Sequence, residues 1–117
     1  MSGAIHLDRH GPHVALIRID RPEARNALTP RMLCALADAF LAVRDDAEVR
    51  AVVLTGTGDV AFCAGGDLGL TLPLMTGARA PQDEFDRRLL DDPRTLEASS
   101  LRGFDIVKPT ICAINGT

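Results

Sequence analysis

Two short stretches near the start of the chain have the pattern of β-strands. Apolar and polar residues alternate over residues 4–9, and β-branched side chains are frequent over residues 14–19. Gly11 and Pro12 lie between the two stretches, and such a pair favours a turn. The pattern therefore predicts a β-hairpin, followed by a polar loop over residues 20–26.

An amphipathic helix is predicted after this loop. Thr29 and Pro30 form a good helix start, because a threonine side chain can cap free N–H groups and proline fits the first helical position. Five apolar residues then recur with helical spacing on one stripe: Leu33, Leu36, Ala37, Phe40 and Leu41. Residues 51–55 are a compact apolar run closed by Gly56, which predicts a buried strand. The order β-β-α-β predicts a right-handed crossover with parallel strands on either side of the helix.

The next part of the chain is helical in pattern. Residues 68–75 are mostly apolar and predict the beginning of a helix, and residues 77–81 predict a mobile link. Residues 82–104 are rich in charge and predict a helix that is broken at Pro93. We expect the charged run 83–94 to be a solvated helix, with a lid over a bound ligand as the alternative.

The last stretch bears on domain organisation. Residues 109–114 predict another buried strand, which runs directly into an Asn-Gly turn at residues 115–116. A buried strand that ends in this way needs further structure after it. We therefore expect residues 1–117 to be the incomplete N-terminal part of one domain.

Composition narrows the class of protein. The chain has 117 residues and a mass of 12.5 kDa, which suits one small domain. Its net charge is -3 and Lys108 is its sole lysine, so we expect no nucleic-acid partner. Three cysteines without a CxxC pair favour a reduced, cytoplasmic setting. No apolar run approaches the roughly 20 residues that cross a bilayer, and we expect no membrane partner.

The segment best suited to binding a ligand and stabilising charge on it is AFCAGGDL, residues 61–68. Gly65 and Gly66 allow the backbone to approach a ligand closely and to direct N–H groups at it. A helix that begins near Asp67 adds the positive end of its dipole. Such a site stabilises negative charge on a carbonyl oxygen. The alternative is a tight turn with a helix cap at Asp67, and the segment alone leaves both interpretations open.

Five segments in a fixed order carry a family resemblance. They are residues 20–28, the capped helix, residues 50–56, residues 61–68 and residues 108–116. Together they resemble the N-terminal portion of the crotonase superfamily, the enoyl-CoA hydratase/isomerase group. The resemblance implies an α/β fold of the crotonase-like ββα spiral type, truncated here, and a homotrimer or hexamer when complete.

The resemblance also implies a function and a set of site residues. Members act on acyl-CoA thioesters, and hydratases (lyases) or isomerases are the expected activities. Coenzyme A is part of the substrate, and no separate cofactor or metal is expected. The implied substrate-binding residues are Ala24, Arg25, Ala64, Gly65, Gly66, Asp67 and Leu68.

Roles follow for some of these residues. The backbone N–H of Gly66 matches one oxyanion donor, while Ala24 and Arg25 fall where the family lines the pocket for the nucleotide end of CoA. Asn26 matches the residue that ties down the loop before the first helix. The family's second donor and its catalytic glutamates match positions beyond Thr117. We therefore expect the 117-residue chain alone to be inactive.

Other interpretations remain open on the sequence. The chain is alternatively a catalytically inactive CoA-binding remnant or pseudoenzyme. Residues 56–61 fit G-x-G-x-x-A, which suggests a dinucleotide-binding module, but the pattern lacks a helix that opens inside the motif. His10 and His13 bracket a turn and are better explained as surface histidines than as metal ligands. Cys63 is better explained by packing than as a nucleophile.

Overall fold

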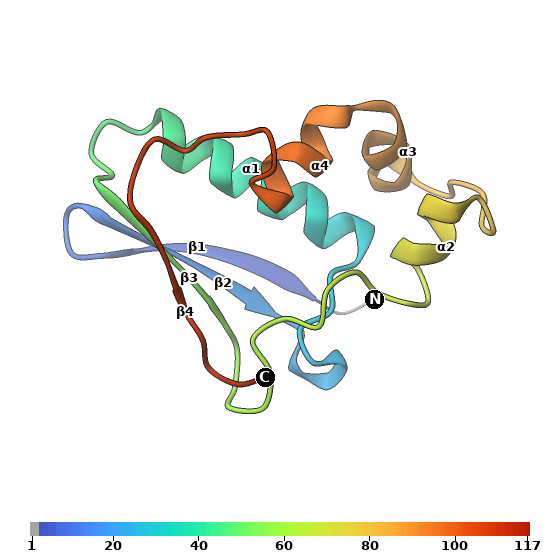
Figure 1. The fold of residues 1–117 in the computed structure, drawn as a ribbon, viewed down its shortest axis with the longest axis horizontal. Helices are drawn as coiled ribbons and strands as arrows, with labels where there is room; N and C mark the ends of the chain where they lie inside the picture. The colour runs from blue at the N-terminus through green and yellow to red at the C-terminus, as the bar shows by residue number, and fades with distance from the viewer. Residues whose placement is uncertain (1–2) are drawn as a thin grey trace.

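The computed structural model describes residues 3–117, which form a four-stranded sheet with helices along one side (Figure 1). The strands are β1 (Ala4–His10), β2 (Val14–Asp20), β3 (Ala51–Gly56) and β4 (Thr110–Ala113). The helices are the 3-10 helix η1 (Pro22–Ala24) and the α-helices α1 (Pro30–Asp45), α2 (Thr71–Thr76), α3 (Glu84–Asp91) and α4 (Pro93–Ser100). The α/β class and the order β-β-α-β are confirmed.

The sheet follows the chain in the order β1-β2-β3-β4. The first two strands pair antiparallel as a hairpin, whereas β2 pairs parallel with β3 and β3 pairs parallel with β4. The parallel pairing of β2 and β3 confirms that α1 is a crossover helix. This topology carries the chain after β3 and the chain after β4 to the same end of the sheet, where the candidate site lies.

The main core lies between α1 and the sheet. Ile17 of β2 and Val52 of β3 are fully buried against Phe40 and Val43 of α1. Burial of such a side chain contributes about 1.5–3 kcal/mol, so this cluster fixes the helix to the sheet. The hydroxyl of Thr29 accepts a hydrogen bond from the N–H of residue 32 at 3.2 Å, as the predicted N-cap requires.

A second layer of helices packs on α1. The predicted break at Pro93 is confirmed, since α3 ends at Asp91 and Pro93 begins α4. A smaller apolar cluster of Leu33, Leu74 and Leu89 joins α1, α2 and α3. Residues 83–94 are mostly exposed, as expected of a solvated helix, but they belong to two helices, and Asp86 and Leu89 of α3 are buried.

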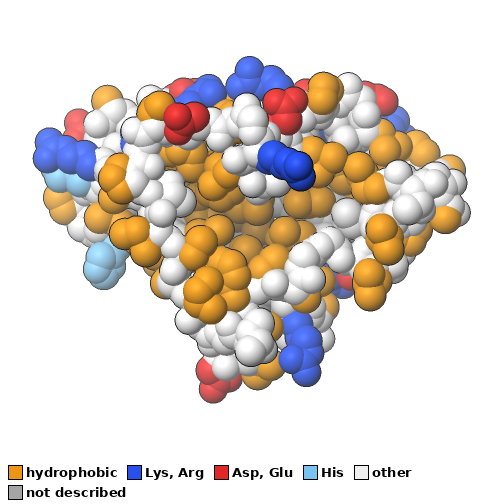
Figure 2. Space-filling view, in the orientation of Figure 1, with side chains coloured by type: hydrophobic (Ala, Val, Ile, Leu, Met, Phe, Trp, Pro, Cys, Tyr) orange, Lys and Arg blue, Asp and Glu red, His pale blue; other side chains and the backbone are white. Residues whose placement is uncertain are grey.

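Strand β4 differs from its predicted environment. All four of its residues are exposed, because β4 is the outer strand of the sheet in residues 3–117. Ile111 and Ile114 are 57% and 63% exposed. Figure 2, which views the molecule from the same side as Figure 1, shows hydrophobic side chains gathered in a hollow between the helices and the C-terminal strand. The β-branched pattern identified the strand correctly but not its burial.

The link between α2 and α3 is anchored by a mostly buried ion pair. Arg79 contacts both carboxylate oxygens of Asp86, at 2.6 and 3.1 Å. The two side chains are 14% and 5% exposed. The hydrogen bond from Arg79 holds the pKa of Asp86 below its ordinary value. The pair joins the end of the link to a helix that packs on α1.

We expect Asp86→Asn to lower the free energy of unfolding by about 1–3 kcal/mol at pH 7, because it removes a charged acceptor from this pair. A lowered folded-state pKa stabilises above the unfolded-state pKa of about 3.9, and the contribution is lost as pH falls through the folded-state pKa. Urea unfolding from pH 7 to pH 3 measures both effects. The control is Asp91→Asn, which changes an exposed residue of the same helix. Equal acid sensitivity of Asp86→Asn and the unmodified protein would contradict the assignment.

Candidate functional site

The residues predicted to contact a ligand surround one open hollow of about 410 Å³. Its wall combines η1 and the turn after it with the loop after β3. The lining residues are Glu23, Ala24, Arg25, Ala27, Ala64, Gly66, Asp67 and Leu68. All of the predicted site residues except Gly65 are in this set. The fold thus brings together two segments that are about forty positions apart in the chain.

A short parallel β-bridge between Leu28 and Gly66 fixes the loop. The N–H of Leu28 donates to the carbonyl of Gly65 at 2.8 Å, and the N–H of Asp67 donates to the carbonyl of Leu28 at 2.9 Å. All described peptide bonds are trans, so the N–H of the Gly65–Gly66 peptide points opposite to its carbonyl and away from Leu28. Within residues 3–117 this N–H has no hydrogen-bond acceptor. The wall of the hollow therefore includes the oriented, unpaired N–H of Gly66.

Asn26 ties the loop before α1 to the loop after β3, as predicted. It is 1% exposed and has a left-handed backbone with φ 58°. Its Oδ1 accepts from the N–H of Arg21 at 2.8 Å. Its Nδ2 donates to the carbonyls of Thr57 and Ala61 at 3.1 and 2.9 Å. Arg25 next to it is also left-handed, with φ 52°, and the two residues turn the chain along the wall of the hollow.

Asn115 holds the same loop from the other side, a role that the sequence analysis missed. Its Oδ1 accepts from the N–H of Gly56 at 3.0 Å. Its Nδ2 donates to the carbonyls of Gly58 and Ala61, both at 2.9 Å. The available signal was an asparagine directly after a predicted strand, which we assigned only to a turn.

Asp67 is paired with Arg21 at the base of the hollow. The guanidinium Nη1 lies 2.7 Å from Asp67 Oδ1, and the two side chains are 11% and 14% exposed. The other oxygen of Asp67 accepts from the N–H groups of Gly69 and Leu70, at 3.1 and 2.8 Å. The Arg21 hydrogen bond is the main cause that holds the pKa of Asp67 below its ordinary value. The carboxylate is therefore ionised and fully engaged.

The predicted cap at Asp67 is confirmed, but the regular helix begins four residues later than expected. Asp67 opens a turn over residues 68–70, and α2 follows from Thr71 with six residues. The carboxylate accepts from the N–H groups of Gly69 and Leu70, and the Asp67 carbonyl accepts from the N–H of Thr71 at 3.0 Å, which is the pattern of an N-cap residue. The regular helix therefore does not begin at the glycine pair, and Gly66 lies just before the capping residue with its N–H unpaired.

The other candidate residues lie apart from the hollow or serve a structural contact. Cys63 is half-buried, and its Sγ accepts from the N–H of Gly65 at 3.4 Å. His10 is exposed, and His13 Nδ1 donates to the carbonyl of Glu48 at 2.9 Å. Among residues 3–117 no group of three or more His, Cys, Asp or Glu side chains is arranged to hold a metal. Among the same residues no helix is long and apolar enough to cross a bilayer.

The dinucleotide-binding interpretation of residues 56–61 is wrong. In that motif a helix opens within the glycine pattern and presents its N-terminus to the pyrophosphate. Here residues 57–60 form bends, and the first helix after β3 begins at Thr71. The first glycine of the pattern, Gly56, instead allows close packing against Asn26 and Asn115, and Gly58 has a left-handed backbone with φ 90°.

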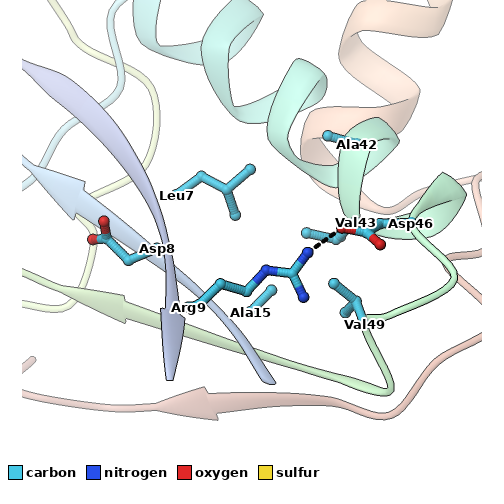
Figure 3. A pocket seen from close by; sticks show the side chains of 8 residues that line it. All are labelled: Leu7, Asp8, Arg9, Ala15, Ala42, Val43, Asp46 and Val49. Atoms are coloured by element: carbon cyan, nitrogen blue, oxygen red, sulfur yellow. Dashed lines mark hydrogen bonds and ion pairs between the residues drawn. The ribbon is translucent and has the colours of Figure 1, made fainter. Parts of the chain in front are cut away.

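A separate hollow of about 260 Å³ lies between β1, β2 and the end of α1 (Figure 3). An ion pair between Arg9 and Asp46 crosses it. Leu7 and Val49 contribute apolar side chains to its lining. None of the predicted site residues lines this hollow, so the candidate site is the hollow beside Gly66.

Known proteins of similar sequence identify the family. The model of the enoyl-CoA hydratase/isomerase family matches residues 9–117. A carnitinyl-CoA dehydratase from Salmonella enteritidis is 37% identical over 116 residues, which are 99% of this chain and 40% of that protein. The chain thus spans about 40% of the length of the curated relatives it matches.

Solved structures agree with the sequence relatives. A crystal structure of a carnitinyl-CoA hydratase from Mycobacterium avium has a TM-score of 0.75 and 38% identity, and the match covers 99% of this chain and 40% of that one. An enoyl-CoA hydratase from Bacillus anthracis has a TM-score of 0.70 and 30% identity, over 96% of this chain and 40% of that one. The predicted superfamily and crotonase-like fold are confirmed. The chain belongs to the enoyl-CoA hydratase/isomerase family.

Proposed function

We propose that the complete protein acts on an acyl-CoA thioester, as an enoyl-CoA hydratase or isomerase, and that Gly66 supplies one oxyanion donor. The observation that supports this most directly is the unpaired N–H of Gly66, which the bridge to Leu28 orients at the wall of the hollow. The names of two relatives, a carnitinyl-CoA dehydratase and a carnitinyl-CoA hydratase, describe removal and addition of water, respectively, on a CoA thioester. Coenzyme A enters as part of the substrate, and no separate cofactor is required.

The reaction of a thioester needs a hydrogen-bond donor beside the carbonyl oxygen on which negative charge develops. When a thioester becomes an enolate, its carbonyl oxygen gains negative charge, and a pre-oriented N–H stabilises that charge without reorganising. Hydrogen bonds on both sides of Gly66 hold the donor before substrate arrives. The groups that move protons decide between hydration and double-bond migration. We assign no such group in residues 3–117, since the carboxylate of Asp67 is fully engaged.

The other side of the hollow suits the nucleotide end of coenzyme A. Ala24 is small, and Arg25 places a guanidinium among the lining residues. Arginine binds phosphate oxygens through charge-assisted hydrogen bonds. We propose that Arg25 meets a phosphate of CoA while Ala64, Asp67 and Leu68 shape the wall near the thioester. We further propose a cytoplasmic homotrimer or hexamer for the complete protein.

We expect Arg25→Glu to weaken the binding of CoA to the complete protein by about 1.5–3 kcal/mol, because a charge-assisted hydrogen bond is lost. Titration calorimetry at moderate salt measures the change. Arg50→Glu is the matched control, since Arg50 is exposed and lies outside the hollow. Equal affinities of the two variants would remove the phosphate role of Arg25 without affecting the family assignment.

A test of Gly66 as a donor requires a change in its backbone, because glycine has no side chain to remove. An ester in place of the Gly65–Gly66 amide, introduced by semisynthesis, deletes one N–H with little change of shape. We expect kcat on crotonyl-CoA to fall about 100-fold or more, with KM much less affected. Steady-state kinetics of the complete protein provide the measurement. An unchanged kcat with a raised KM would mean that Gly66 only holds the substrate.

We expect the isolated 117-residue chain not to hydrate crotonyl-CoA. In its described residues we assign one oxyanion donor, the N–H of Gly66, and no acid or base. A missing donor and a missing acid–base group each typically cost about 100-fold or more in rate. The absorbance of the conjugated thioester follows the reaction. Turnover by the purified chain would show that its own residues complete the catalytic site.

A further inference from the structure

Thr71, the first residue of α2, contacts both Leu28 and Gly66. It is 6% exposed, and its hydroxyl donates to the carbonyl of Leu28 at 2.7 Å. Its methyl group also lies against Gly66, because a Cβ added to Gly66 would be 3.4 Å from Thr71 Cγ2. One side chain therefore touches both partners of the β-bridge.

The carbonyl of Leu28 is a shared acceptor. It receives the hydroxyl of Thr71 and, at 2.9 Å, the N–H of Asp67. The N–H of the same Leu28 binds the carbonyl of Gly65. Leu28 thus controls the peptide planes on both sides of Gly66, and a rotation of Leu28 turns the N–H of Gly66 with it.

The position of Thr71 is itself fixed. Arg79 donates to the carbonyl of Leu70 through Nε at 3.2 Å and Nη2 at 2.9 Å. The same guanidinium is paired with Asp86 of α3. The backbone at the start of α2 is therefore held against the second helical layer. Thr71 follows directly, and its hydrogen bond connects this fixed backbone to Leu28.

We infer that Thr71 is a positioning residue, whose hydroxyl sets the direction of the Gly66 N–H through the carbonyl of Leu28. The catalytic consequence rests on the proposed function, while the geometric statement does not. A hydroxyl that merely satisfies a buried polar group would leave the direction of the Gly66 N–H unchanged when it is removed. The two roles therefore make different predictions for the same substitution.

The test uses three variants of the complete protein. Thr71→Val removes the hydroxyl and keeps a branched side chain, and the Leu28 carbonyl retains the N–H of Asp67, so the variant leaves no acceptor unpaired. Thr71→Ser restores the hydroxyl without the methyl group. Thr76→Val is the matched control, since Thr76 is exposed on the same helix and its hydroxyl binds the Pro73 carbonyl at 3.3 Å.

Two measurements are made on each variant. Residual dipolar couplings of protein labelled with 15N-glycine report the direction of the Gly66 N–H, and couplings at the other glycines report folding. Steady-state kinetics on crotonyl-CoA report kcat and KM. We expect Thr71→Val to change the Gly66 coupling and to lower kcat about 10-fold, with KM within about 2-fold, because a misdirected donor acts mainly on the transition state. Thr71→Ser and Thr76→Val retain the coupling and the kcat of the unmodified protein.

Each contrary result has a definite meaning. An unchanged Gly66 coupling in Thr71→Val overturns the inference, whatever the activity. A changed coupling with normal kcat overturns the catalytic part. If the unmodified protein does not turn over crotonyl-CoA and the Gly66 coupling still changes in Thr71→Val, the positioning role stands and the proposed activity on this probe fails.

Discussion

Two asparagine side chains donate to one backbone oxygen, the carbonyl of Ala61, and the candidate site depends on this junction. Asn26 reaches it from the loop before α1, and Asn115 reaches it from the chain after β4, each at 2.9 Å. Three segments that are distant in sequence are thereby joined at one end of the sheet. A buried amide that binds several backbone groups specifies position closely, because each partner would be costly to leave unpaired. The loop with Gly66 continues directly from this junction.

Glycine is needed where these backbones meet. A Cβ on Gly56 would overlap the carbonyl of Phe62 and lie 2.8 Å from Asn26 Nδ2. A Cβ on Gly116 would overlap the backbone of Val60 and lie 2.6 Å from the N–H nitrogen of Ala61. These glycines serve close approach of chain to chain, whereas Gly66 borders open space at the hollow. The same residue type thus packs the junction and leaves a donor accessible beside it.

Local patterns were enough to predict the hairpin, the capped helix α1 and the glycine loop, because turns, caps and periodicity act over a few residues. The partners that complete the site were not predictable in this way. Arg21 pairs with Asp67 across 46 positions, and Thr71 binds Leu28 across 43 positions. Such contacts follow from the tertiary fold. Burial of β4 also depends on what lies beside an outer strand, so the β-branched pattern of residues 109–114 could not decide it.

The electrostatics of the hollow follow from how Asp67 is neutralised. A carboxylate beside a forming enolate opposes the negative charge on the thioester oxygen. Here Arg21 contacts one oxygen of Asp67 at 2.7 Å, and two backbone N–H groups occupy the other. The pair is therefore close to neutral when seen from the hollow, and the lowered pKa of Asp67 keeps it so across the physiological range. The N–H of Gly66 does not titrate, so the proposed donor itself has no pH dependence. The donor and the carboxylate of Asp67 therefore add no titration of their own between pH 5 and 9, and the groups that transfer protons are separate from the residues that hold the donor.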